Sequence, residues 1–153
     1  MPNTYSQIYI HCVFAVKNRL NLIPKKHGEE IKKYISGIIS GLNCKLIAIE
    51  NVPNHFHILV SMSPSISVSD FMGKVKANSS RFINEKKFVA GKFEWQTGYG
   101  VFSVSKSGAE KVIKYIINQE EHHRTKSFGE EYLEFLKVYE VPYDERYIFE
   151  DVL

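Results

Sequence analysis

Two histidines separated by one residue, His55 and His57, stand in the apolar run NHFHILV, whose composition is typical of a β-strand. Side chains two positions apart on a strand point to the same face, so the two imidazoles project together. Phe56 and Ile58 then point to the opposite face, toward a core. Two neutral imidazoles this close can bind one divalent cation. Histidines on strands are also found as partly exposed packing residues, so the pair by itself leaves both interpretations open.

A second group of chemically capable residues lies on a segment with helical periodicity, SGAEKVIKYIINQEEHHR. Tyr115, Gln119 and His122 share a stripe that lies roughly 120° around the helix from its apolar positions. A phenol, which can act as a nucleophile, therefore shares a helix face with a metal-capable amide oxygen and an imidazole. A tyrosine at the margin of a helix, with its hydroxyl in water, fits the same pattern.

The periodicity of the whole chain predicts the elements that position these residues. Their order, β-α-β-β-α-β followed by helices, is the ferredoxin-like arrangement, an α+β fold in which two helices pack on one face of an antiparallel sheet. An open sheet face of this kind is a common platform for nucleic acid. Ser107 and Glu110 form a capping box at the start of the tyrosine-bearing helix. The predicted strands cover 5–16, 44–50, 55–62 and 101–105, and the predicted helices cover 25–42, a stretch from Ser67, 107–124 and 130–139.

Charge is distributed unevenly along the 153 residues, a length that suits a single domain over 1–153. The net charge is only +3, but residues 130–153 carry eight acids against two bases, and residues 1–129 carry nine acids against 18 bases. A basic body followed by an acidic C-terminal helix and tail favours a polyanionic partner such as nucleic acid. A solvated basic surface gives the same composition.

The chain carries no signal of export or of membrane insertion. No apolar stretch approaches the roughly 18 residues of a membrane span. The first residues, MPNTYSQIYIH, have neither the basic start nor the cleavage site of a signal peptide. The two cysteines, Cys12 and Cys44, form no CxxC motif. We therefore expect a cytoplasmic protein with reduced thiols and no membrane partner.

Taken together, these motifs resemble those of the single-tyrosine HUH transposases of small bacterial insertion sequences, the IS200/IS605-like elements. NHFHILV fits H-U-H, in which U is a bulky apolar residue, and YIINQEEHH fits Y-x-x-x-Q. GYGVFSVSKS precedes the second motif, and an early strand ends in VFAVKNR. The resemblance covers nearly the whole chain, with the motifs in the right order. Asn54 stands where an acidic residue is more usual, directly before the first histidine.

The resemblance implies a role for each motif residue. It makes Tyr115 the nucleophile, and it makes His55, His57 and Gln119 the ligands of a divalent metal, Mg²⁺ or Mn²⁺. Two imidazoles and an amide oxygen are softer than an all-oxygen set, so Mn²⁺ should bind more tightly. The implied substrate is single-stranded DNA with hairpins at the element ends, cleaved to a 5′-phosphotyrosine and a free 3′-OH. The implied assembly is a homodimer, in which the tyrosine helix of one subunit can complete the other's site, with no nucleotide cofactor.

Other residues are weaker candidates. Basic side chains on the first strand's end and on the second helix could contact phosphates, although ordinary solvated surface explains each of them equally well. His122 and His123 fit a surface or a DNA contact, while His11 receives no role. Trp95 suits core anchoring better than base stacking. The candidate DNA contacts are Lys17, Arg19, Lys74, Lys76 and Arg81.

Two other functions are compatible with the sequence. A non-catalytic or domesticated nucleic-acid-binding protein on the same fold would bind DNA without cleaving it. Such a module has no need of a tyrosine beside a metal site, which argues against it. A metal-dependent phosphoesterase would release its product to water and form no covalent adduct.

Overall fold

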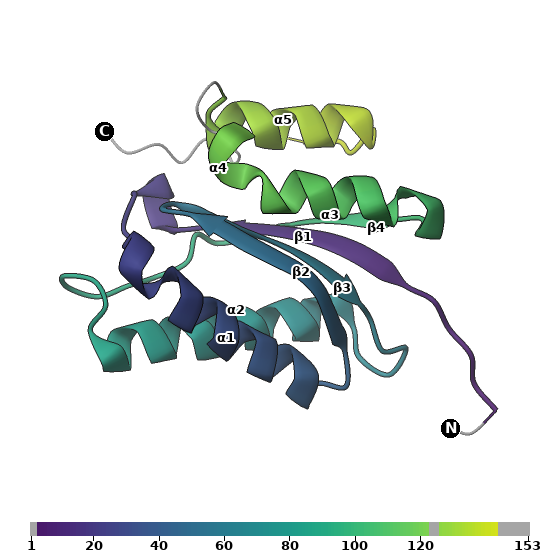
Figure 1. Ribbon diagram of the computed structural model, residues 1–153, viewed down its shortest axis with the longest axis horizontal. Helices are drawn as coiled ribbons and strands as arrows, with labels where there is room; N and C mark the ends of the chain where they lie inside the picture. The colour runs from purple at the N-terminus through teal and green to yellow at the C-terminus, as the bar shows by residue number, and fades with distance from the viewer. Residues whose placement is uncertain (1–2, 123–125, 144–153) are drawn as a thin grey trace.

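A single antiparallel sheet lies at the centre of the protein, whose computed structural model describes residues 3–122 and 126–143. The strand order across the sheet is β2-β3-β1-β4 (Figure 1). With helices α1 and α2 in their places along the chain, the order β1-α1-β2-β3-α2-β4 confirms the predicted ferredoxin-like α+β fold. The strands are β1 (Tyr9–Ala15), β2 (Lys45–Val52), β3 (His55–Ser61) and β4 (Gly100–Val104), and the two helices are α1 (Lys25–Gly41) and α2 (Val68–Lys86).

Helices α1 and α2 cover one face of the sheet and enclose the main apolar core with it (Figure 1). The alternation of β1 sends Cys12 and Phe14 into this core, as predicted. The ring of Phe14 stacks on Phe56 of β3 at a centroid distance of 5.6 Å, and Trp95 meets Phe14 edge-on at 4.7 Å. Trp95 is therefore a core anchor, which confirms the interpretation from the sequence. Ser67 caps α2 by accepting a hydrogen bond from the backbone of Asp70.

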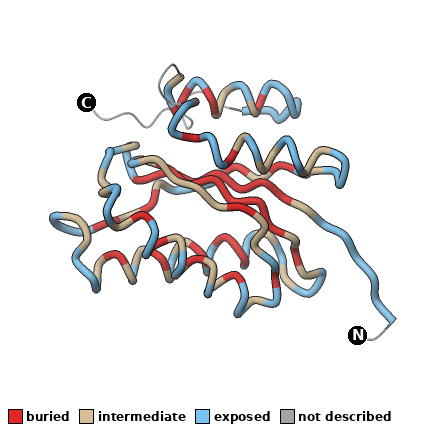
Figure 2. The backbone as a smooth tube through the Cα atoms, in the orientation of Figure 1, coloured by how far each residue is buried: buried red, intermediate tan, exposed pale blue. Residues whose placement is uncertain are grey.

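The opposite face of the sheet is covered by a second layer of helices (Figures 1 and 2). This layer consists of α3 (Ala109–Ile117), α4 (Gln119–His122) and α5 (Phe128–Val138). Helix α3 packs on β2 and β3, and α5 packs on side chains that β1 and β4 direct away from the main core, forming a smaller apolar cluster. Its buried members are Val13, Ala15, Phe102, Phe128 and Leu136. The second face of the sheet is therefore not the open platform that the strand pattern suggested.

Several boundaries differ from the sequence-based predictions, including those of the first strand, which begins at Tyr9 instead of residue 5, and of the last helix, which begins at Phe128 instead of residue 130. The predicted long third helix divides at Asn118, whose φ of −94° and ψ of 25° end α3 before α4 begins. The predicted capping box does not form, because Gly108 precedes α3 and Ser105 accepts the bond from its backbone N–H instead. The turn between β2 and β3 is shorter than predicted, since Val52 already pairs with His55. No helix within the described ranges is long and apolar enough to cross a membrane.

Candidate catalytic and metal site

Strand β3 directs His55 and His57 together toward the α3 and α5 layer, with ring centroids 5.0 Å apart. Phe56 lies in the main core on the opposite face, so the predicted alternation is confirmed. The open sheet face expected from the strand pattern is not found here, since both residues are 0% exposed. The reason is the second helix layer, which alternation on a strand cannot reveal.

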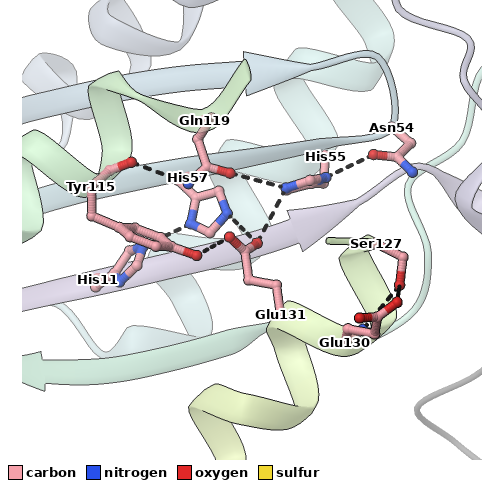
Figure 3. A network of polar contacts seen from close by, with 9 residues as sticks. All are labelled: His11, Asn54, His55, His57, Tyr115, Gln119, Ser127, Glu130 and Glu131. Atoms are coloured by element: carbon pink, nitrogen blue, oxygen red, sulfur yellow. Dashed lines mark hydrogen bonds and ion pairs between the residues drawn. The ribbon is translucent and has the colours of Figure 1, made fainter. Parts of the chain in front are cut away.

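The tyrosine and the glutamine of the helix motif meet the histidines within the same chain (Figure 3). The Oε1 atom of Gln119 lies 3.4 Å from Nε2 of His55. The amide nitrogen of Gln119 donates to the backbone carbonyl of Tyr115 at 3.3 Å, one helical turn earlier. Because that carbonyl can only accept, this bond fixes the amide with its oxygen toward His55. The half-buried Tyr115 reaches the same cluster with its hydroxyl.

A carboxylate that the sequence analysis missed completes the cluster. Glu131 of α5 is 2% exposed, and its Oε1 lies 2.9 Å from Nε2 of His57 and 3.5 Å from Nε2 of His55. The Tyr115 hydroxyl donates to its other oxygen, Oε2. Burial would raise the pKa of Glu131, but its polar contacts with the His55 and His57 rings outweigh burial and bring this pKa to about 2. The carboxylate is therefore ionised at neutral pH.

His11 is a further buried polar residue at this site, in a place that the sequence left without a role. Its Nε2 lies 2.8 Å from Nδ1 of His57, and its ring packs edge-on against Phe135 at 5.3 Å. Burial and the neighbouring His57 together lower the pKa of His11 to about 3, against the opposing effect of Glu131. A neutral His11 can therefore hold the orientation of the His57 ring, the usual role of a partner behind a metal-binding imidazole.

The donor set of the cluster suits a divalent metal. Oδ1 of Asn54 accepts a hydrogen bond from Nδ1 of His55 at 2.7 Å, so in the neutral ring Nε2 presents its lone pair to the cluster. The residue that departs from the family pattern thus orients the first histidine without adding charge. One ligand atom from each of His55, His57 and Glu131 lies within 4.8 Å of the others. Imidazole nitrogens with amide and carboxylate oxygens form a set that Mn²⁺ accepts and that Mg²⁺ can share.

The candidate DNA contacts do not gather around this cluster. Lys74, Lys76 and Arg81 lie on α2, in the helix layer behind the sheet, and Lys76 donates to the carbonyls of Gln96 and Gly98 at 2.8 Å each. The 3-10 turn η1 (Lys17–Arg19) lies nearer, because Val16, which precedes it, donates to the carbonyl of Asn54. Lys17 forms an exposed ion pair with Glu94 at 3.0 Å. His122 ends α4 with an undescribed side chain, and His123 lies outside the described residues.

Comparison with known proteins identifies the family of the chain. The family model of IS200-like transposases matches residues 4–119. The transposase of insertion sequence element IS200 from Salmonella typhimurium is 31% identical over 119 residues, which is 74% of this chain and 78% of that protein. The ISDra2 transposase TnpA of Deinococcus radiodurans is 25% identical over 118 residues, or 74% of this chain and 84% of that protein.

A solved structure of a REP-associated tyrosine transposase bound to a REP hairpin shares the fold. Its TM-score is 0.61 at 12% sequence identity, and the match covers 79% of this chain and 72% of that chain. The family match spans all of the sheet and reaches Gln119, the last of the motif residues. The chain therefore belongs to the family of IS200-like transposases, the DNA-cleaving and strand-transferring enzymes of insertion sequences.

Proposed function

We propose that this protein cleaves and rejoins single-stranded DNA at hairpin-bearing element ends through a covalent bond to Tyr115. The observation that carries the proposal is the position of the Tyr115 hydroxyl, which is hydrogen-bonded to the carboxylate that also contacts both histidines. A nucleophile beside a metal-capable cluster is the arrangement that phosphodiester cleavage needs. His55, His57 and Gln119 are the proposed metal ligands.

The proposed chemistry is a transesterification. The Tyr115 oxygen attacks the phosphorus and loses its proton, an O–P bond forms, and the bond between phosphorus and the 3′-oxygen breaks. The departing oxygen takes up a proton and becomes a 3′-OH, leaving the 5′-phosphate on the tyrosine. A 3′-OH from another strand end then reverses the step and displaces Tyr115. Because the phosphotyrosine retains the energy of the broken bond, rejoining needs no nucleotide cofactor.

The chain's own groups prepare this step. The bond to Glu131 holds the Tyr115 hydroxyl at the cluster, and Asn54 and His11 orient the two histidine rings. When bound there, Mg²⁺ or Mn²⁺ would neutralise the charge that develops on the phosphate oxygens. The ordinary pKa of a phenol lies near 10, so a free tyrosine supplies little phenolate at neutral pH. A positioned and water-poor site is what compensates for this weak nucleophile.

The proposed partners are hairpin DNA and a second copy of the chain. The solved relative bound to a REP hairpin and the nine-base excess of residues 1–129 support a folded single strand as the substrate. The structure brings Tyr115 and the histidines together within one chain, so the proposed homodimer would exchange this helix rather than create the site. Sedimentation of the protein with and without hairpin DNA measures the assembly, and a monomer under both conditions would exclude the dimer.

The decisive experiment replaces Tyr115 by phenylalanine. Wild-type protein is incubated with labelled hairpin-bearing single-stranded DNA and Mn²⁺, denatured, and tested for label that moves with the protein. Tyr115→Phe should abolish this adduct and leave DNA binding nearly unchanged, because only the attacking oxygen is lost. Peptide mapping of the wild-type adduct should identify Tyr115 as the modified residue.

Tyr34→Phe is the matched control. It removes the same atom from a tyrosine of α1 whose ring stacks on Phe82 at 3.9 Å, in the helix layer on the far side of the sheet. The covalent adduct on Tyr115 should form in this variant as it does in the wild type. Binding without any adduct would favour the non-catalytic reading, and cleavage without an adduct would favour a phosphoesterase.

A further inference from the structure

Glu131 is a charged side chain at a position where the proposed ligand set of His55, His57 and Gln119 does not require one. It is 2% exposed, whereas its neighbour Glu130 is exposed and lies beside the capping Ser127. Buried carboxylates are rare unless they are paired or bind a metal. The proposed reaction uses only the hydrogen bond from Tyr115 to Glu131, and the contacts of Glu131 with His57 and His55 call for a second role.

The local sequence of α5 fixes the carboxylate in the cluster. Ser127 caps the helix by accepting a bond from the backbone of Glu130, which sets the helical register. Phe128, three residues before Glu131, packs against the His55 ring at 4.5 Å. Phe135, four residues after it, meets the ring of His11 at 5.3 Å. Anchors on both sides of Glu131 share its helix face, so the acid is directed at the histidines by packing.

Electron-rich atoms converge at this point. Nε2 of His55 presents a lone pair, because Nδ1 donates to Asn54. The amide oxygen of Gln119 lies 3.4 Å from that nitrogen, and Oε1 of Glu131 lies 3.5 Å from it. Acceptors that face one another in a buried site repel unless a cation lies among them. Two neutral imidazoles and an amide carry no net charge, so the carboxylate supplies the anionic ligand that a hard divalent cation favours.

The geometry points to Glu131 as a direct ligand of the catalytic cation, alongside His55, His57 and Gln119. This inference rests on the metal site of the proposed function and extends it to α5. Oε1 faces the histidine nitrogens, and Oε2 accepts the hydrogen bond from the Tyr115 hydroxyl. One carboxylate thus joins the metal site to the nucleophile, and Glu131 positions the phenol as well as binding the cation. The chemical class is an N₂O₂ site for Mn²⁺ or Mg²⁺.

Calorimetric titration with Mn²⁺ alone, in the absence of DNA, tests this assignment without relying on activity. Glu131→Gln keeps the shape of the side chain and removes its charge, and it should weaken Mn²⁺ binding by more than the roughly 10- to 100-fold that the loss of an outer-shell partner costs. Glu130→Gln makes the same chemical change one residue earlier, at an exposed position, and should bind as the wild type does. Tyr115→Phe should also change the affinity little, because it removes only a partner of Oε2.

The outcomes separate the inference from the proposed metal site. His57→Ala should lose binding if the metal site exists at all. Loss in His57→Ala with unchanged or tighter binding in Glu131→Gln would overturn the role of Glu131 alone. Unchanged binding in both variants would overturn the metal site itself. A loss in Tyr115→Phe as large as that in Glu131→Gln would show that the carboxylate acts through the tyrosine, against direct ligation.

Folding of each variant is checked by circular dichroism before titration. If Glu131→Gln does not fold, Glu131→Asp is titrated instead, because it keeps the charge and moves the carboxylate back by one methylene. A ligand that has moved out of reach should bind Mn²⁺ more weakly than the wild type. Wild-type affinity in a folded Glu131→Asp protein would overturn the assignment.

Discussion

Both faces of β1 and β3 carry buried residues, but the face toward α1 and α2 is apolar, whereas the face toward α3 and α5 combines apolar side chains with buried histidines. On the α1 and α2 side, β1 and β3 present Cys12, Phe14 and Phe56, which are at most 1% exposed. The neighbouring residues His11, His55 and His57 point to the other side and are at most 2% exposed. Consecutive residues of β1 and β3 therefore alternate between two layers. The apolar layer lies toward α1 and α2, and the polar layer, which holds the three histidines, lies toward α3 and α5.

The different side chains of the two layers indicate that the apolar layer stabilises the protein and that the polar layer performs its chemistry. Apolar burial is non-directional and contributes in proportion to area, so the α1 and α2 layer can stabilise the fold without fixing each side chain uniquely. A buried polar group contributes only if it finds a partner, so the geometry of the polar layer is specified atom by atom. The cluster around His57 meets this requirement through His11 on one ring nitrogen and Glu131 on the other.

The largest expected effect is the loss of stability caused by a cavity in the apolar layer. Phe14→Ala removes a ring that is 1% exposed and packs between Phe56 and Trp95. We expect the free energy of unfolding, measured by urea titration, to fall by about 3–5 kcal/mol. The Mn²⁺ affinity of the folded variant should stay that of the wild type, because the cavity opens on the far side of the sheet. A loss of affinity at full folding would contradict the independence of the two layers.

Binding of Mn²⁺ in the polar layer should change the free energy of unfolding by a smaller amount. At a free Mn²⁺ concentration of 100 times Kd, the free energy of unfolding should rise by about 2.7 kcal/mol in the wild type. The same increment should appear in Phe14→Ala and be absent in His57→Ala, and chelation with EDTA should remove it. Equal stabilisation of His57→Ala would mean that Mn²⁺ binds elsewhere on the protein.

The same comparison explains what could be predicted from the sequence. Alternation assigned the residues of β1 and β3 to the correct faces, and the helical stripe separated Tyr115 and Gln119 from the apolar positions of the single helix predicted there. Alternation reports which residues share a face, however, and it does not report whether a further layer covers that face. The burial of His55 and His57 was missed for this reason.

Glu131 and His11 were missed because their roles depend on contacts between distant segments. Glu131 lies 74 residues from His57 in the chain, and His11 lies 46 residues from it. The sequence analysis treated the eight acids of residues 130–153 only as an acidic helix and tail, so the one buried member was not singled out. A usable signal was present, since Glu131 shares a helix stripe with Phe128 and Phe135. An acid on an apolar stripe is a candidate for a buried site.

The smallest expected effect distinguishes a layer that opens locally from one that opens only with the whole fold. Leu136 of α5 is 7% exposed and belongs to the smaller apolar cluster. Leu136→Ala should weaken the docking of α5 by about 2 kcal/mol, the low end for such a substitution, because this cluster is small and lies near the surface. If α5 opens as its own unit, its amide hydrogens should exchange about 30-fold faster, since each 1.4 kcal/mol changes the opening equilibrium tenfold.

Amide hydrogens of α1 should keep their wild-type exchange rates in Leu136→Ala. Hydrogen exchange read by mass spectrometry measures both helices in one experiment, and Phe14→Ala provides the converse control, in which protection in α1 falls. Equal acceleration of α5 and α1 in Leu136→Ala would show that the two layers unfold together, and α5 could then not release Glu131 from the site while the sheet stays intact.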